Sequence, residues 1–361
     1  MEVKDSRIFI FYAFDVAYEI AVERMEKVLG KKPIELQLSF TKTTPKHIKY
    51  STPPYKIHLG KKTIEIDNEK YNFDVSAKIF SFGVISICFE TQFKGSLKEL
   101  CSLSNKFSGD LNIEREAKRY VERIKNELKD ILIKERKEKT FEDYIIFYIK
   151  EFEKKITSKE LLRDGKEIAR ILLSERDIEL SDEEVERALK NRVSYTENDI
   201  AIIDWNAALI YDPKFALDTV DILEYAVVKL LEFRSYDEDL DEQIDKAYDE
   251  VSKESAYLTI LISPFSSTMR ELETATLDIA DTSEKVENAL KLIGDEYLAK
   301  LYQTATAAFY IEDWKKSVRR KLDVLDKIYS TIYSRIQTDR FVVLELLIVI
   351  LIVLEIIIYY V

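Results

Sequence analysis

The chain has 361 residues and a formal net charge of −12, and 34% of its residues are charged. With only seven glycines and six prolines beside 21 tyrosines and 18 phenylalanines, its composition excludes a disordered or collagen-like protein. The acidic balance argues against wholesale nucleic-acid binding, although a local basic patch could still bind phosphate. Cys88 and Cys101 form no paired motif, so we expect reduced, packed thiols, as in a cytosolic protein.

Residues 1–111 are predicted to form one α+β segment, a sheet with helices on one face. Hydrophobicity patterns indicate strands over 8–14, 71–80 and 84–93, with shorter strands at 34–39, 55–58 and 63–66. Helices are predicted over 16–29, which ends at Gly30, and over 96–103.

Residues 112–255 are predicted to form a helical strut and a second α+β segment. The strut is a charged helix over 113–139, and a strand over 141–152 follows it. Two helices come next, the second capped by Ser181 with Glu184 three residues later. Strands over 193–196 and 200–210 then lead to a turn at residues 211–213.

From Asp218 onward the pattern is helical. A helix over 218–234 is followed by the acidic stretch SYDEDLDEQID and another helix. Two long amphipathic helices, over 267–309 and from 311 onward, are predicted to pack as an antiparallel hairpin, a stalk over 256–340. The predicted fold class is therefore α+β, with an N-terminal mixed sheet-and-helix body and a C-terminal helical hairpin that runs into one transmembrane helix.

The last stretch, FVVLELLIVILIVLEIIIYYV at 341–361, is predicted to be this transmembrane anchor. Its 21 residues span about 31 Å as a helix, close to the ~30 Å hydrocarbon core of a bilayer. Its Phe, Val, Leu and Ile residues favour insertion by roughly 5–10 kcal/mol, while Glu345 and Glu355 cost at most about 3 kcal/mol each. The alternatives are a buried core helix and an Ile/Val-rich strand pair, but both are normally shorter and interrupted by turn residues.

The charges that flank the span predict its orientation. Lys327, Arg335 and Arg340 lie on its N-terminal side, so the positive-inside rule keeps the preceding residues in the cytoplasm. The apolar run at 8–14 is too short for a signal peptide and is followed by Asp15. We therefore expect a tail-anchored, single-pass protein of the cell membrane with its body facing the cytoplasm.

Glu345 and Glu355 are ten positions apart in the span, so they lie about 80° apart around a helix and share one side. Glu345 can reach the headgroups, whereas Glu355 lies about 15 Å deeper and must be protonated or paired. One hypothesis is that Glu355 faces a partner helix from a second copy and shares a hydrogen bond there. The alternative is a protonated Glu355 that bonds to its own helix or to Tyr359.

A basic cluster precedes the span, formed by Lys315, Lys316, Arg319, Arg320 and Lys321. On an upright helix this cluster lies about 30–39 Å from the first anchor residue, several times the Debye length of about 8–10 Å, so anionic lipid is hardly felt there. We expect the cluster to pair with the protein's own acidic helices or with an acidic partner such as ribosomal RNA.

Metal and nucleotide motifs are incomplete. His47 and His58 have no ligand at helical spacing, and the acidic run Asp237, Asp239, Asp241 lacks the glycine and the final glutamate of a calcium loop, so a solvated helix start is the favoured interpretation. The Gly60-Lys61-Lys62 stretch lacks the first glycine and the Ser or Thr of a phosphate loop. We therefore expect no metal, no cofactor and no catalytic residue.

The stretch from Val286 to Ile356 resembles the C-terminus of the required-for-meiotic-nuclear-division family, domain-of-unknown-function family 155, and is most similar to its prokaryotic branch. AKIFSFGVISICFE (77–90), NDIAIIDWNAALIYDP (198–213) and LLEFRSYDEDLDE (230–242) extend the resemblance over most of the chain. The resemblance implies a membrane-anchored body with no established catalytic activity. Its eukaryotic members lie at the mitochondrial inner membrane and support translation there as oligomers.

Together these features predict a tail-anchored membrane scaffold that presents a cytoplasmic body to a protein or ribonucleoprotein partner. We expect membrane lipid, a second copy and a protein or ribosome as partners, and no specific DNA binding. The runner-up is a membrane-tethered enzyme, for which Asp204 beside Trp205 and Asn206 is the first suspect. A third possibility is a stalk and anchor that assemble into a purely structural ring or filament.

Overall fold

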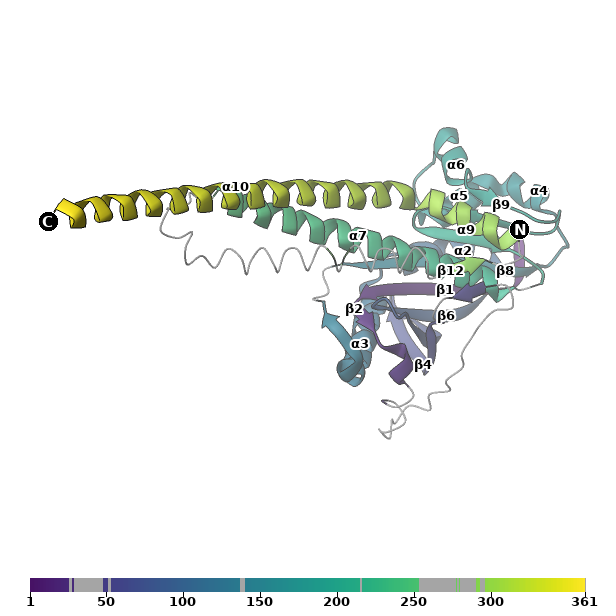
Figure 1. The fold of residues 1–361 in the computed structure, drawn as a ribbon. Coiled ribbons are helices and arrows are strands. Elements are labelled where there is room, and N and C mark those ends of the chain that lie inside the picture. Colours follow the sequence, from purple (N-terminus) through teal and green to yellow (C-terminus); the bar gives the residue numbers. More distant parts are fainter. Residues whose placement is uncertain are drawn as a thin grey trace. The chain divides into compact units, whose positions relative to one another are not determined.

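The structure is a computed structural model that describes residues 1–25, 28, 48–50, 53–136, 140–214, 216–252, 277, 279, 290–292 and 296–360. The chain forms two compact units, each made of two chain segments (Figure 1). The first unit comprises Met1–Ser235 and Thr282–Asp313, and the second comprises Tyr236–Asp281 and Trp314–Val361. The segment boundaries predicted from the sequence stay predictions.

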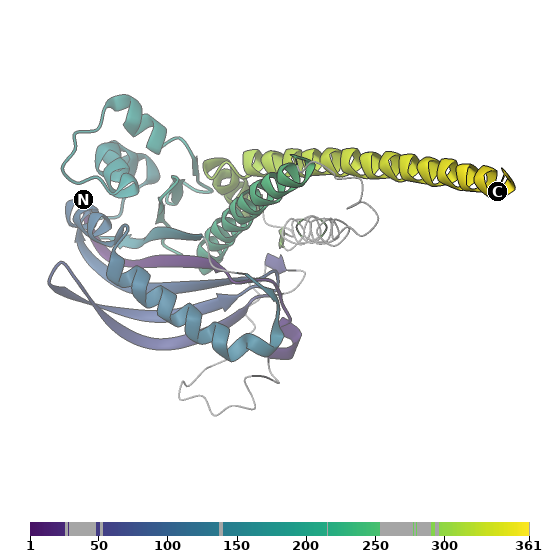
Figure 2. The ribbon, with the colours of Figure 1, turned by 90° about the vertical axis from the view of Figure 1, so that its left-hand side faces the viewer.

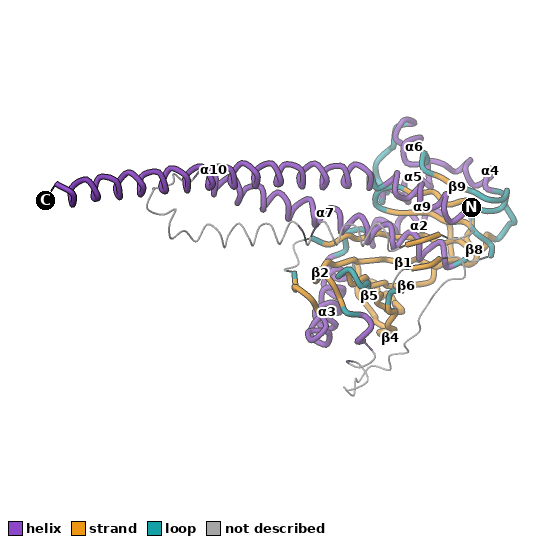
Figure 3. Tube along the Cα trace, in the orientation of Figure 1, coloured by secondary structure: helices purple, strands orange, loops and turns teal. Residues whose placement is uncertain are grey.

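An eight-stranded sheet organises the first unit (Figure 3). Its strands follow the order β4 (Tyr55–Ile66), β5 (Glu69–Ile79), β6 (Val84–Ser96), β1 (Glu2–Asp15), β8 (Phe141–Phe152), β11 (Ala207–Tyr211), β10 (Ile200–Ile203) and β9 (Arg192–Val193). Strand β11 is parallel to β8, and the other neighbours are antiparallel. Two small sheets pair β2 (Ala17–Ile20) with β7 (Leu132–Glu135) and β3 (Ile48–Tyr50) with β12 (Leu290–Leu292).

The central strand β1 is buried on both faces. Ile8, Ile10 and Tyr12 lie on one face of the sheet, and Phe9 and Phe11 alternate with them on the other. All five side chains are less than 5% exposed. A strand that is apolar on both faces requires cover on both sides, and helices supply it.

One face is covered by α2 (Leu97–Phe107), α3 (Leu111–Leu128) and α5 (Gly165–Leu173), and Figure 2 shows α3 lying across the strands. Ser96 and Glu99 form a capping box that starts α2, and Asp110 caps α3. The buried residues of α3 recur every three or four positions, namely Ile113, Ala117, Val121, Ile124 and Leu128. The short helices α4 (Ser158–Leu161) and α6 (Asp182–Ala188) and the 3-10 turns η1 (Val22–Arg24), η2 (Lys129–Ile131) and η3 (Leu162–Asp164) complete this unit's connections.

The opposite face is covered by residues 217–235 of α7 (Leu217–Ser252) and by α9 (Glu296–Ala308). Tyr225 of α7 packs on Phe80 with 6.3 Å between ring centroids. Phe309, just after α9, packs edge-on against Tyr144 at 5.2 Å. The sheet is therefore sandwiched between two helical layers.

The second unit contains residues 236–252 of α7 and residues 314–360 of α10 (Ile311–Tyr360). Its buried side chains include Leu240 and Ala247 from α7 and Val318, Leu325 and Ile328 from α10. The two helices lie side by side and run in the same direction (Figures 1 and 2). Within this unit α7, which is distant in sequence, is therefore a parallel neighbour of α10.

The predicted α+β class is confirmed, with an N-terminal mixed sheet, C-terminal helices and one apolar terminal helix. The helix predicted over 16–29 is wrong for residues 17–20, because this stretch pairs with β7 and Ile20 N donates to Ser81 O at 2.7 Å. Gly83 makes this approach possible, since its φ is +102° and a Cβ there would lie 1.7 Å from Ala17 O.

Other boundaries also differ from their predictions. The strut ends at Leu128, because residues 132–135 form β7. Residues 200–210 form a hairpin of two strands instead of one strand. The acidic stretch after residue 234 continues α7 as helix. Of the helix predicted over 267–309, Glu296–Ala308 is helical and Leu290–Leu292 is a strand, while most of the remainder lies outside the described residues.

Candidate functional site

The terminal part of α10 is the feature with the clearest physical meaning. Phe341–Tyr359 form 19 helical residues with a mean hydropathy of 3.3, and none of this stretch is covered by other parts of the second unit. Apolar side chains in such a continuous run are normally removed from water by protein or by lipid. The helix is long and apolar enough to cross a membrane.

Glu345 and Glu355 lie within this stretch, and both side chains are exposed. Neither forms a hydrogen bond or ion pair with another described residue. Their predicted role in an interaction stays a prediction.

The basic cluster lies on the part of α10 that packs beside α7. Lys321 binds two carboxylates of α7, with Nζ 2.8 Å from Asp237 Oδ2 and 2.6 Å from Asp241 Oδ1, and it also donates to the Asp237 carbonyl oxygen at 3.0 Å. Burial by itself lowers the pKa of Lys321, but the hydrogen bonds to Asp237 and Asp241 outweigh it and raise that pKa above its ordinary value. This cation holds the two helices together.

The other four bases of the cluster differ in burial. Lys316, Arg319 and Arg320 are exposed, and Lys315 is half-buried. Lys315, Lys316 and Arg319 each have interaction partners of their own. The acidic run that resembles a calcium loop thus lies inside a helix, where Asp237 and Asp241 bind a lysine instead of an ion. The expected solvated helix start is wrong, because α7 continues through this run.

A buried ion cluster joins α7 to the sheet within the first unit. Lys78 of β5 places Nζ 2.5 Å from Glu224 Oε2 and 2.6 Å from Asp221 Oδ1. The side chains of Lys78 and Glu224 are only 9% and 3% exposed, whereas that of Asp221 is 22% exposed. Sequence reasoning missed this cluster. Its one signal was a lysine inside the strand DVSAKIF, in which Val75, Ala77 and Ile79 alternate with it and are buried on the other face.

A second ion pair reinforces the same helix-to-sheet contact. Arg234 of α7 donates to Glu142 of β8, and the Glu142 side chain is 11% exposed. Paired charges at both ends of residues 221–234 of α7 fix the register of this helix on the sheet. Cys88 lies close to this cluster, and burial followed by the charge of Glu224 raises the pKa of its thiol.

Asp204, the residue considered first for a catalytic role, forms structural contacts. It lies at the turn between β10 and β11, is 4% exposed, and accepts a hydrogen bond from Arg187 at 3.0 Å. Its carbonyl oxygen accepts from the Tyr144 hydroxyl at 3.0 Å. Trp205 packs edge-on against Phe309 with 6.5 Å between ring centroids. These contacts attach the hairpin to neighbouring elements.

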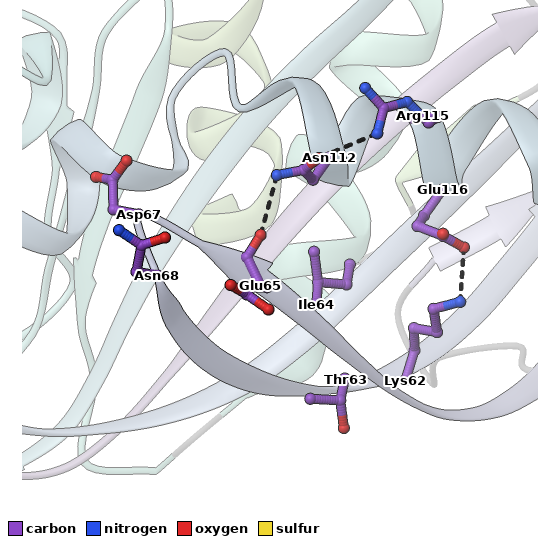
Figure 4. A pocket seen from close by; sticks show the side chains of 9 residues that line it. All are labelled: Lys62, Thr63, Ile64, Glu65, Asp67, Asn68, Asn112, Arg115 and Glu116. Carbon is purple, nitrogen blue, oxygen red and sulfur yellow. Dashed lines mark hydrogen bonds and ion pairs between the residues drawn. The ribbon is translucent and has the colours of Figure 1, made fainter.

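A polar hollow of about 600 Å³ lies between the β4–β5 hairpin and α3 (Figure 4). Its charged lining comprises Lys62, Glu65, Asp67, Arg115 and Glu116. Lys62 pairs with Glu116 at 2.8 Å, and this contact lowers the pKa of Glu116 although burial alone would raise it. Two cations against three carboxylates give the hollow a slightly negative balance, which does not favour a phosphate or another anion.

The histidines and cysteines considered as possible metal ligands can now be placed. In the described part of the chain, His, Cys, Asp and Glu side chains form no group of three that could hold a metal ion. His58 lies 3.3 Å from Asp74 across the β4–β5 hairpin, and His47 lies outside the described residues. Cys88 and Cys101 are both buried free thiols, as expected.

Comparison with known proteins places this fold in a family. The family described as "Uncharacterized protein MJ0711, N-terminal domain" matches residues 5–217, more than half of the chain. The chain belongs to this family. The uncharacterized protein MJ0711 of Methanocaldococcus jannaschii is 27% identical over 237 residues, which cover 65% of this chain and 71% of the relative. No solved structure matches the chain.

The MJ0711 N-terminal match begins within β1 and ends where α7 begins, so it covers the eight strands of the large sheet together with α2 to α6. The ion partners on α7, the basic cluster and the apolar end of α10 lie beyond it. The match supports a prokaryotic family. It does not carry the name of the required-for-meiotic-nuclear-division family.

Proposed function

We propose that this member of the MJ0711 family is a tail-anchored membrane scaffold, whose α+β unit faces the cytoplasm and binds a protein or ribonucleoprotein partner near the membrane. One observation carries the proposal. Helix α10 continues without interruption from its ion-paired contact with α7 into 19 uncovered residues of mean hydropathy 3.3. Lipid is the environment that removes such a surface from water.

The orientation rests on charge. Lys327 is exposed on α10 shortly before the span, and Arg335 and Arg340 follow it in the same helix. Basic residues within about 15–20 residues of a span favour the cytoplasmic side. The residues that precede the span would therefore stay in the cell interior, where the buried thiols Cys88 and Cys101 remain reduced.

We also propose that this chain is related to the required-for-meiotic-nuclear-division family. Its support is the order of the resembling stretches, which fall on the β5–β6 hairpin, on the β10–β11 hairpin and on α7 and α10. That family's link to translation is the reason for naming a ribonucleoprotein among the partners. A different strand order in an experimental structure of one of its members would contradict the kinship.

Membrane attachment can be tested with the full chain and a chain that ends at Arg340. We expect the full chain to stay in the membrane pellet after alkaline carbonate washing and the shortened chain to become soluble. Ile350→Arg should weaken insertion by about 2.5–3.5 kcal/mol near the midplane, while Ile350→Leu is the matched control that should insert normally. Release of the full chain by carbonate would contradict the anchor.

Orientation and partner binding need separate measurements. Protease added outside intact cells should leave the α+β unit whole, and protease added to inverted vesicles should digest it; the reverse pattern would contradict the orientation. Affinity capture from membranes, with and without residues 341–361, should recover a protein or ribonucleoprotein partner that depends on the span. If both chains capture the same set, anchoring does not select the partner.

A further inference from the structure

The carboxyl group of Glu355 lies deep in the proposed membrane span. Glu355 lies about 21 Å along the helix from Phe341 and about 9 Å from the far edge of a 30 Å hydrocarbon core, too deep for its side chain to reach either headgroup layer. No described residue of the chain binds its carboxyl group. A carboxyl group in hydrocarbon is stabilised chiefly by a hydrogen-bond partner, and a second helix in the membrane can supply one.

The two ends of α10 present opposite sides of the helix. Val318, Leu325 and Ile328 are buried on the side that faces α7, and Lys321 joins them there. At about 100° per residue, Glu355 and its neighbours on the same stripe lie about 180° around the helix from that side. The stripe consists of Glu345, Ile348, Ile352, Glu355 and Tyr359, all exposed. Helix α7 therefore does not block a partner that approaches this stripe.

The spacing of the stripe fits a helix pair. Its members are separated by three, four, three and four residues, which is the repeat by which two helices keep one seam in contact. Two aliphatic side chains, Ile348 and Ile352, lie between the glutamates and would pack across the seam. The tyrosine at the end, Tyr359, would lie at the membrane interface, where aromatic rings are favoured.

We propose that the occupant of this stripe is a second copy of the same chain, in a parallel dimer of the spans in which the two Glu355 carboxyl groups hydrogen-bond to each other. The inference rests on the proposed membrane anchor. In the dimer both carboxyl groups are protonated, and the O–H of each donates to the carbonyl oxygen of the other. This satisfies two buried polar groups with one contact.

A second copy fits because its Glu355 lies at the same depth in the membrane. All copies enter the membrane in the same orientation, so the same glutamate lies at the same depth in each, and a twofold axis parallel to the spans brings the two together. A helix from another protein would need a polar residue of its own at that depth. A second copy of this chain already carries such a residue, Glu355, at that depth.

The contact is confined to the span. On the same side of α10, outside the membrane, lies the exposed cation Lys327. In a parallel pair this cation would approach its own copy and repel it, so the helices diverge above the membrane. Because salt screens such repulsion over about 8–10 Å, moderate salt should strengthen the dimer.

The test compares full-length variants in mild detergent, with the dimer fraction measured by light scattering over a dilution series. Glu355→Leu should weaken self-association about 10- to 1,000-fold, the range for losing the two interhelical hydrogen bonds of the carboxyl pair in a membrane. Glu355→Gln, which keeps a donor and an acceptor, should weaken it less. Glu345→Leu, at the edge of the membrane, is the matched control and should change it less than Glu355→Leu.

Cysteine cross-linking in native membranes tests the seam itself. Ile352→Cys lies on the stripe and should form an intermolecular disulfide on oxidation. Ile350→Cys lies on the opposite side of the helix and should not. The parent chain, with only the buried Cys88 and Cys101, supplies the background.

Three results would overturn the dimer, namely an unchanged dimer fraction for Glu355→Leu, a monomeric parent chain, or equal cross-linking at positions 350 and 352. Carbonate washing separates this failure from failure of the anchor. A chain that resists carbonate but is monomeric refutes the dimer alone. A chain that carbonate releases refutes the anchor and the dimer with it.

Discussion

The buried lysine of β5 offers the sharpest test of how α7 is held on the sheet. In Lys78→Met the ammonium group is replaced by an apolar side chain of similar length, and Glu224 and Asp221 lose their shared cation. The Glu224 side chain is 3% exposed and cannot be hydrated in place. The Asp221 side chain, 22% exposed, can still reach water. The uncompensated charge is therefore mainly that of Glu224.

Removing one partner of a buried ion pair typically costs about 3–5 kcal/mol. We expect Lys78→Met to lower the free energy of unfolding by this amount, which corresponds to a drop of about 6–20 °C in the melting temperature for a unit of this size. The double variant Lys78→Met/Glu224→Leu removes both buried charges. It should recover most of the loss, because replacing the whole pair by apolar groups is often close to neutral.

The assay is urea unfolding of the full chain in mild detergent, with hydrogen exchange of the β5 amides used to isolate the first unit. Glu224→Gln serves as a milder comparison, because Lys78 keeps Asp221 as its counterion. If Lys78→Met loses less than about 1 kcal/mol, or if the double variant is less stable than Lys78→Met, the buried charge is not what holds α7 on the sheet.

Three further predictions concern other parts of the chain. The stability that Lys321 gains from Asp237 and Asp241 should be complete below the unfolded pKa of Lys321 and disappear as pH rises through its raised folded pKa. We therefore expect α7 to separate from α10 in strongly alkaline solution. Circular dichroism of the parent chain should show this transition, and Lys321→Ala should lack it. Gly83→Ala should lower the free energy of unfolding by at least about 2–4 kcal/mol, because the new Cβ would lie 1.7 Å from Ala17 O. Gly109→Ala, at a φ of +67° in open space, should lower it by only about 1–2 kcal/mol. Equal losses of stability in thermal melts would refute the clash. Cys88 and Cys101 should react with a thiol reagent only after unfolding, since both are buried and burial raises both pKa values; rapid labelling of the native chain would refute this.

Local patterns predicted most of the elements that begin and end on strong signals. The strands β1, β5, β6 and β8 are apolar runs bounded by turn residues, and the cap at Ser181 accepts a hydrogen bond from Glu184 N as expected. The failures occur where contacts between distant segments decide the structure. Residues 17–20 have a helical pattern, but pairing with β7 and with the turn at Gly83 makes them a strand.

Some features of the candidate site could likewise be predicted from the sequence, and others could not. The apolar span and its two glutamates can be read from composition alone, because hydropathy is a property of each residue. The partner of Lys321 cannot, since Asp237 and Asp241 lie about eighty positions away and come within reach only when α7 and α10 pack. Lys78 looks like one ordinary lysine among many until α7 covers it.

The amino-acid sequence by itself determined the α+β class and the apolar end of the chain, because both follow from the periodicity and hydropathy of neighbouring residues. The tertiary structure decided which segments meet, namely the order of the eight strands, the burial of Lys78 beneath α7, and α7 as the neighbour of α10. The physical reason is that a buried charge or a paired strand edge depends on a partner far away in the chain, and short-range patterns carry no record of that partner.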